Sequence, residues 1–311
     1  MATKFAEILR ALEDESMALS RTMLRRLSNL GEDDRQMLYA GWGAIPRERR
    51  CEIIRQLAEI TDADFDTDFT AVTRLALTDL SEEVREAAIE ASWPDETPQV
   101  FNRLLPMAAV DSSVSVRASA MSALGRFILL GELGKFDASL ARQAQNLAIR
   151  LYSKADEDTD VRRRALEALS NSSRVEVGPM IRESYESDNA RMRISAVYAM
   201  GRSCDERWSD VVLQELSSDD PAMRFEAVRA AGELELEEAV PLIGPMLRDP
   251  DRQIMEMAIW SLGEIGGAEA QRFLSTMLQY AEDKDDQGLM EMVEDAIASA
   301  GLVGSGLVFD S

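Results

Sequence analysis

The residues that most resemble an ion-binding site lie between positions 283 and 294. Five of them match positions one, three, five, six and twelve of a calcium-loop template: Asp283, Asp285, Gln287, Gly288 and Glu294. Calcium prefers clustered hard oxygens on a loop that turns sharply at glycine. However, glutamine is atypical at the fifth position, and no second loop of this kind exists to pair with it. We therefore favour an acidic connecting loop over a calcium site and leave both interpretations open.

The sequence contains few other residues with the chemistry of a catalytic or metal site. It has no histidine among its 311 residues, which excludes imidazole-dependent triads and the usual zinc sites. Cys51 and Cys204 are far apart and are most simply small hydrophobic residues. No phosphate-binding glycine motif follows a predicted strand. Paired carboxylates are most simply solvated helix faces. We expect no catalytic residue, no cofactor and no bound metal, and hence not an enzyme.

A row of residue types that often dominate protein interfaces occurs at equal spacing. Tyr198, Arg229 and Trp260 are 31 residues apart. If the spacing reflects a structural repeat, the three side chains line up in space and form a contact strip on an outward surface. The alternative is an intramolecular stack in which Arg229 bridges the two aromatic faces. We favour the stack and retain the strip as a candidate partner-binding site.

A second candidate surface comes from polar residues on the second amphipathic segment of each repeat. Helical solenoids commonly bind partners along their concave side. We expect the outward residues of each repeat's second helix to lie there, namely Arg182, Glu183, Glu186, Gln214 and Arg248. Their mixed charges predict a polar groove. Together with the acidic composition of the chain, they favour a protein partner with a basic or mixed-charge surface.

The elements that must position these residues follow from a ten-residue pattern that occurs seven times. Its fifth position is always alanine: Ala88, Ala120, Ala165, Ala196, Ala227, Ala258 and Ala296. The interval from Ala165 to Ala196, Ala227 and Ala258 is 31 residues each time, which indicates stacked supersecondary units. The apolar positions form one helical stripe, and small residues in its middle allow the next helix to approach closely.

Other columns of the pattern predict how each unit begins, ends and connects. The tenth position is mostly glycine, which we interpret as a left-handed helix end. Acidic loops precede the pattern and are suited to capping helix N-termini. The second position holds Arg85, Arg117, Arg162, Arg193 and Arg224. We favour arginine pairing with the acidic loops over a contact strip for an acidic ligand.

The pattern, followed by amphipathic segments such as VGPMIRESY at 177–185, resembles HEAT repeats of the phycobilisome-lyase type. The resemblance covers roughly residues 70–301 and is clearest in RMRISAVYAMGR at 191–202 and AMRFEAVRAAGEL at 222–234. It implies an all-α fold, a right-handed α-solenoid or α-α superhelix of HEAT-like helical hairpins of the armadillo-like class. Proteins with such repeats include chromophore lyases, iron hydroxylases, a DNA-repair branch and scaffolds. The hydroxylases use His-Glu metal ligands, which this chain lacks.

The expected organisation is a continuous array with modified ends. We expect a divergent N-terminal cap at 1–78, the repeat array at 79–301 and a tail at 302–311. The step from Val116 to Val161 is 45 residues, which indicates an inserted helical extension and turn around 125–136. A 38-residue step from Ile254 to Met292 places extra residues at 281–287.

Charge and composition narrow the function. The formal charge of −23 opposes nucleic-acid binding, and no signal peptide or membrane-length apolar run is apparent. We expect a bacterial, cytoplasmic protein that is a monomer or a weak oligomer. The favoured function is a non-enzymatic scaffold or adaptor that binds protein. The alternative is a bilin (chromophore) lyase-like protein or a lyase-associated chaperone.

Overall fold

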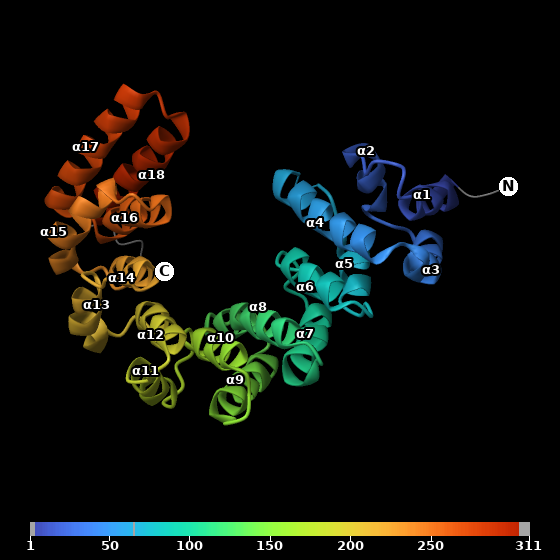
Figure 1. Ribbon diagram of the computed structural model, residues 1–311, viewed down its shortest axis with the longest axis horizontal. Coiled ribbons are helices and arrows are strands. Elements are labelled where there is room, and N and C mark those ends of the chain that lie inside the picture. The colour runs from blue at the N-terminus through green and yellow to red at the C-terminus, as the bar shows by residue number, and fades with distance from the viewer. Residues whose placement is uncertain (1–3, 65, 305–311) are drawn as a thin grey trace. The chain divides into compact units, whose positions relative to one another are not determined.

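The computed structural model describes residues 4–64 and 66–304, and every regular element in these ranges is helical (Figure 1). The chain forms two compact units, Met1–Ala168 and Leu169–Ser311, which are described separately. In both, helices pack against the next helix along the chain and, in most repeats, against the helix after that. The expected all-α solenoid is confirmed.

The first unit begins with short helices and continues with longer hairpins. Its helices are α1 (Lys4–Glu13), α2 (Arg21–Leu24), η1 (Arg25–Leu27), α3 (Glu32–Gly41), η2 (Trp42–Ala44), α4 (Arg47–Ala63), α5 (Thr70–Ala76), α6 (Glu82–Ala91), α7 (Pro98–Val110), α8 (Val114–Glu132) and α9 (Ala138–Ser153), and α10 (Thr159–Leu169) ends at the boundary. The inserted segment is the expected one: α8 is extended to Glu132, a turn contains Gly134 with φ of 69°, and Asp137 caps α9.

The second unit has a regular pair of layers. Its helices are α11 (Val177–Tyr185), α12 (Ala190–Arg202), η3 (Glu206–Trp208), α13 (Ser209–Glu215), α14 (Pro221–Glu233), η4 (Glu237–Ala239), α15 (Val240–Ile243), η5 (Gly244–Arg248), α16 (Arg252–Ile265), α17 (Gly267–Lys284) and α18 (Gln287–Gly304). We call α12, α14, α16 and α18 the inner layer, and α11, α13, α15 and α17 the outer layer (Figure 1).

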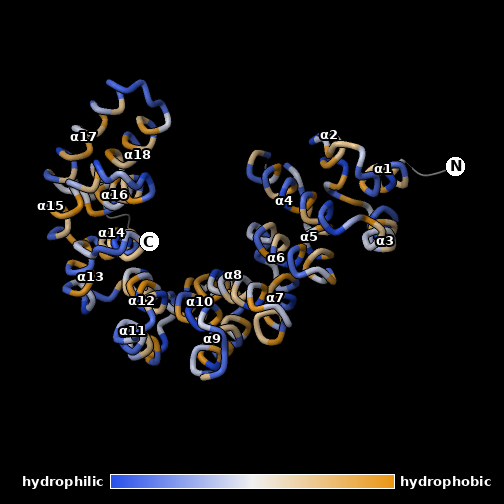
Figure 2. Tube along the Cα trace, viewed as in Figure 1, coloured by the Kyte–Doolittle hydropathy of each residue, from blue (hydrophilic) through white to orange (hydrophobic). Residues whose placement is uncertain are grey.

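The alanine column forms the close contacts between helices that carry the pattern. The side chains of Ala88, Ala120, Ala165, Ala196, Ala227 and Ala258 are completely buried, and Ala296 is 7% exposed. Large apolar side chains on either side of the column fill the remaining space between the layers. Hydrophobic and hydrophilic positions alternate along each helix, and the connection from α17 to α18 is hydrophilic (Figure 2). The sequence-based account of the core is therefore confirmed.

The glycine column has a different role from the one expected. Gly125, Gly201, Gly232 and Gly263 lie within helices and are not left-handed. A Cβ atom built on Gly201 would lie 2.6 Å from the Cα atom of Ala230, and one on Gly263 would lie 3.0 Å from the Cα atom of Ala296. These glycines are needed because the next helix passes too close for a side chain.

In three repeats of the second unit, the residue with positive φ comes three positions after the column glycine. Cys204, Glu235 and Gly266 have φ of 48°, 51° and 69° and repeat at the 31-residue interval of the array. The prediction of a left-handed turn at the glycine was therefore wrong in position. A turn with positive φ does occur, but the helix continues past the glycine before the chain reverses direction.

One helix of the described part of the chain is long and apolar enough to cross a membrane by length and composition. This helix is α8, and 56% of its most apolar window is buried inside the protein. Its ion-paired Arg117 lies in the same span, so its apolar residues serve as the core of a helical hairpin.

Candidate interaction surface

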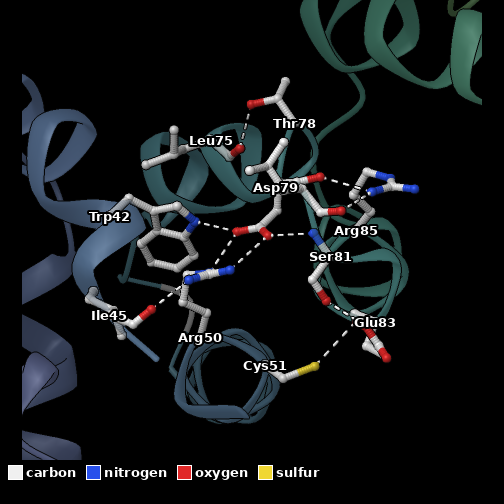
Figure 3. A network of polar contacts seen from close by, with 11 residues as sticks. Trp42, Ile45, Arg50, Cys51, Leu75, Thr78, Asp79, Ser81, Glu83 and Arg85 are labelled. Carbon is white, nitrogen blue, oxygen red and sulfur yellow. Dashed lines mark hydrogen bonds and ion pairs between the residues drawn. The ribbon is translucent and has the colours of Figure 1, made fainter. Parts of the chain in front are cut away.

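Arg85 of the second column, together with Arg50, connects consecutive loops of the first unit, and Figure 3 shows both arginines beside Asp79. The carboxylate of Asp79 is buried and accepts hydrogen bonds from Trp42 Nε1 at 2.7 Å and Arg50 Nη2 at 3.0 Å. Arg85 donates to the carbonyl oxygen of Asp79 at 2.9 Å and binds both carboxylate oxygens of Asp111 at 2.6 and 2.9 Å. Each arginine therefore joins one loop to the next.

The same arrangement, in which an arginine binds two consecutive loops, continues along the first unit. Arg117 donates to the carbonyl oxygen of Asp111 at 2.8 Å and to the carboxylate of Glu157 at 2.7 Å. Burial raises the pKa of Glu157, but hydrogen bonds from Lys154 and Arg117 outweigh this effect and hold the pKa below its ordinary value. These arginines are structural, and the predicted pairing with acidic loops is confirmed for Arg85 and Arg117.

The remaining arginines of the column mainly bind backbone carbonyls. Arg162 donates to Tyr152 and Arg193 to Ser187, both at 2.9 Å. Arg224 donates to the carbonyl oxygen of Ser218 at 2.8 Å and lies 3.9 Å from the carboxylate of Asp249. Arg193 and Arg224 therefore fix the loop before their helices through backbone carbonyls, whereas Arg162 binds the last turn of α9.

Tyr198, Arg229 and Trp260 come from α12, α14 and α16 of the inner layer, as the equal spacing predicts. The guanidinium carbon of Arg229 lies 3.9 Å from the centre of the Tyr198 ring, and Arg229 Nη2 is 2.6 Å from Glu226 Oε2. Arg229 therefore forms one half of the expected stack. Trp260 lies over Gly232, where a built Cβ would be 2.9 Å from the ring, and remains 38% exposed.

A second arginine–glutamate pair lies beside this row. Arg202 Nη1 is 3.2 Å from Glu233 Oε1, at the C-terminal ends of α12 and α14. Burial raises the pKa of Glu233, although Arg229 and Arg202 act in the opposite direction. Charges on this part of the inner layer are therefore paired within α14 or between α12 and α14, whereas the indole of Trp260 is 38% exposed.

The second predicted surface lies on the outer layer. Arg182, Glu183 and Gln214 are exposed on α11 and α13, Glu186 directly follows α11, and Arg248 ends η5. Successive inner helices make extensive contacts, whereas successive outer helices make few and are more widely separated (Figure 1). The closely spaced layer is the concave one, so these five residues do not lie on the concave side that the sequence suggested.

Outer helices interact mainly through individual polar and aromatic side chains. The guanidinium of Arg182 lies 5.6 Å from the ring centre of Trp208. Tyr185 donates a hydrogen bond to Glu215, and burial together with this bond raises the pKa of Tyr185 to about 12. Arg248 instead borders a cavity, which sequence periodicity did not reveal because its walls come from different columns.

The residues of the calcium template do not form a loop. Helix α17 ends at Lys284 and α18 begins at Gln287, so Gln287, Gly288 and Glu294 are helical. Only Asp285 and Asp286 connect the helices: Asp285 has φ of 52°, and the Asp286 carboxylate accepts a hydrogen bond from the Leu289 amide at 3.1 Å. This geometry supports the acidic connecting loop and does not present the ligands of a twelve-residue calcium loop.

Comparisons with known proteins agree with this architecture. Residues 209–293 match the family model for HEAT repeats, and no curated protein sequence matches the chain significantly. The chain is similar to the structure of the complex of CpcE and CpcF of phycocyanin lyase from Nostoc sp. PCC7120. That match has a TM-score of 0.58 and 14% identity and covers 90% of this chain and 97% of that chain.

Two other solved structures have lower scores. YibA from Escherichia coli has a TM-score of 0.43 and 16% identity, with 97% of both chains covered. Human deoxyhypusine hydroxylase has a TM-score of 0.38 and 19% identity, with 84% of this chain and 96% of that chain covered. The similarity to the CpcE–CpcF complex shows the fold, and the match at 209–293 locates the repeats that carry Arg229 and Trp260.

Proposed function

We propose that this chain, a HEAT-repeat protein with the fold of the phycocyanin lyase subunits, is a non-enzymatic scaffold or adaptor. In this proposal it binds a protein partner through the inner layer of its second unit. The observation that carries the proposal is the exposure of Trp260 on that layer. Tryptophan is among the residues that most often dominate binding energy at protein interfaces.

The neighbours of Trp260 on its own helix favour a cationic partner residue. Glu256 and Glu264 are one turn before and one turn after Trp260, so the three side chains share a face of α16. Glu256 is paired with Arg252 at 2.6 Å, whereas Glu264 makes no hydrogen bond or ion pair with the described residues. An indole face beside a carboxylate attracts lysine or arginine through both cation–π and ionic attraction.

Arg229 supports this arrangement from the next helix. Arg229 is held between Tyr198 and Glu226, so its charge is already compensated. It forms part of the surface next to Trp260. The partner surface in this proposal is basic or mixed in charge. The net charge of −23 would speed association with such a surface and oppose nucleic acid. A cytoplasmic location and a monomeric or weakly oligomeric state are part of the proposal.

The fold neighbour adds support, since CpcE and CpcF were solved as a complex with each other. A scaffold with stacked hairpins presents long lateral faces to a partner without needing a catalytic centre.

In the test, the wild-type protein and the variants Trp260→Ala and Tyr39→Ala are each used to capture partners from the native host. Tyr39 is a matched control because it is 50% exposed and lies in the first unit. We expect wild type and Tyr39→Ala to retain the same partner and Trp260→Ala to weaken its binding at least about tenfold, as at an interface hot spot. Equal affinity of all three proteins would contradict the proposed surface.

A chromophore-lyase role is a second candidate because the neighbour of TM-score 0.58 is part of phycocyanin lyase. Mixing the purified protein with a bilin and measuring visible absorption and fluorescence distinguishes the two. A lyase or its chaperone would change the bilin spectrum, whereas the proposed scaffold would leave it unchanged.

A further inference from the structure

A cavity of about 400 Å³ opens on the outer layer of the second unit, between η5 and α17. Its apolar walls are formed mainly by Pro245, Leu247, Phe273, Met277 and Tyr280. This volume and lining fall within the range of small-molecule sites, which are mostly apolar with few polar groups. The cavity lies apart from the Trp260 surface, on the opposite layer of the same unit.

The shape of the cavity depends on a contact between two helices. Gly244 begins η5, and a Cβ atom built on it would lie 2.4 Å from the ring of Phe273. The glycine therefore allows the ring to lie directly against the backbone of η5. On α17, Met277 and Tyr280 follow Phe273 at helical spacing, so the three side chains face η5 together.

The charge beside this cavity is unusual for the protein. The chain has 57 acidic and 34 basic residues, yet the guanidinium of Arg248 makes no hydrogen bond or ion pair with the described residues. The carboxylate of the adjacent Asp249 faces Arg224 instead, at 3.9 Å. On the α17 side, Lys284 Nζ lies 5.8 Å from the ring centre of Tyr280, which lines the cavity.

We propose that this cavity binds an unbranched aliphatic carboxylate. The hydrocarbon chain packs among Leu247, Phe273 and Met277, where its burial removes apolar surface from water. The carboxylate binds Arg248, the charged residue that lines the cavity, through charge-assisted hydrogen bonds. This inference does not depend on the proposed scaffold function, because the two surfaces share no residue.

The test uses the full-length protein labelled with ¹³C at methionine methyl groups and titrated with sodium decanoate below its micelle concentration. The Met277→Leu variant identifies the Met277 signal. We expect that signal to shift in a saturable way, while that of Met121, which is buried in the first unit, stays in place. Arg248→Gln is expected to weaken binding about tenfold, as for the loss of one charge-assisted interaction.

Two controls make the result specific. Arg272→Gln removes another exposed arginine of the second unit that does not line the cavity, and it should bind decanoate like wild type. Decyltrimethylammonium has a similar chain and the opposite charge, and it should leave the Met277 signal unchanged. The proposal is overturned if decanoate fails to shift that signal, if both amphiphiles shift it equally, or if Arg248→Gln binds as wild type does.

Discussion

At the scale of single residues, the guanidinium of Arg85 binds three polar groups that belong to two different loops. It binds the carboxylate of Asp111 and the backbone carbonyls of Asp79 and Leu80, and its side chain is only 12% exposed. Arg85→Ala leaves the Asp111 carboxylate unpaired in a site where it is 10% exposed. We expect a loss of about 3 kcal/mol in the free energy of unfolding, measured by urea denaturation.

The control for this prediction is Arg103→Ala. Arg103 is exposed on α7 and should change the free energy of unfolding by less than about 0.5 kcal/mol. If both variants were equally stable, the arginines of the second column would not contribute to stability.

Glu157 gives a pH-dependent prediction at the same scale. Its pKa is depressed in the folded protein because Lys154 and Arg117 outweigh the effect of burial. A carboxylate with a depressed pKa contributes stability above its unfolded pKa and loses it as the pH falls through the folded pKa. We expect Glu157→Gln to lower the free energy of unfolding by about 2 kcal/mol at pH 7.

The difference between wild type and Glu157→Gln should shrink below the ordinary glutamate pKa of 4.5 and disappear at still lower pH. Urea denaturation at several pH values checks this directly. A difference that is constant with pH would show that ionised Glu157 is not the stabilising species.

At the scale of helices, the small residues of the inner layer determine how closely neighbours pack. Gly201→Ala would place its methyl group 2.6 Å from the Cα atom of Ala230, which belongs to the backbone of α14 and cannot rotate away. We expect a loss of about 2 kcal/mol in the free energy of unfolding because α12 and α14 must move apart.

Gly301→Ala is the matched control, since Gly301 occupies the same column on α18 and a built Cβ meets nothing within 4 Å. Alanine has the higher helix propensity, so this variant should be unchanged or more stable by up to about 1 kcal/mol. Destabilisation by both variants would indicate a conformational requirement for glycine instead of close packing.

The alanine and arginine columns could be predicted from the sequence because each is periodic, and periodic positions share one environment. The glycine column could not be assigned correctly. Close approach and a left-handed turn both select glycine, and only the position of φ near 50–69° at Cys204, Glu235 and Gly266 separates them. The concave side was misassigned because the spacing of helices within each layer depends on how neighbouring repeats pack against one another. The cavity depends on the single contact of Gly244 with Phe273, which has no periodic signal.

At the scale of the whole chain, the described contacts join mainly neighbouring hairpins within each compact unit. In such arrays stability is close to a sum of unit and interface contributions, so a local defect stays local. We expect Gly201→Ala to reduce amide hydrogen-exchange protection in α12 and α14 while leaving α6 and α7 unchanged. Uniform loss of protection along the chain would contradict this expectation and indicate a single cooperative unit.

The two layers of the second unit also differ in helix length. The inner helices α12, α14, α16 and α18 contain 13, 13, 14 and 18 residues, whereas the outer helices α11, α13, α15 and α17 contain 9, 7, 4 and 18. The outer helices α13 and α15 are the short ones, and α17 shows that an outer helix can extend toward solvent without disturbing the stack. The outer edge is therefore where the chain tolerates engineered insertions, and a fluorescent reporter placed between α17 and α18 should leave the inner surface intact.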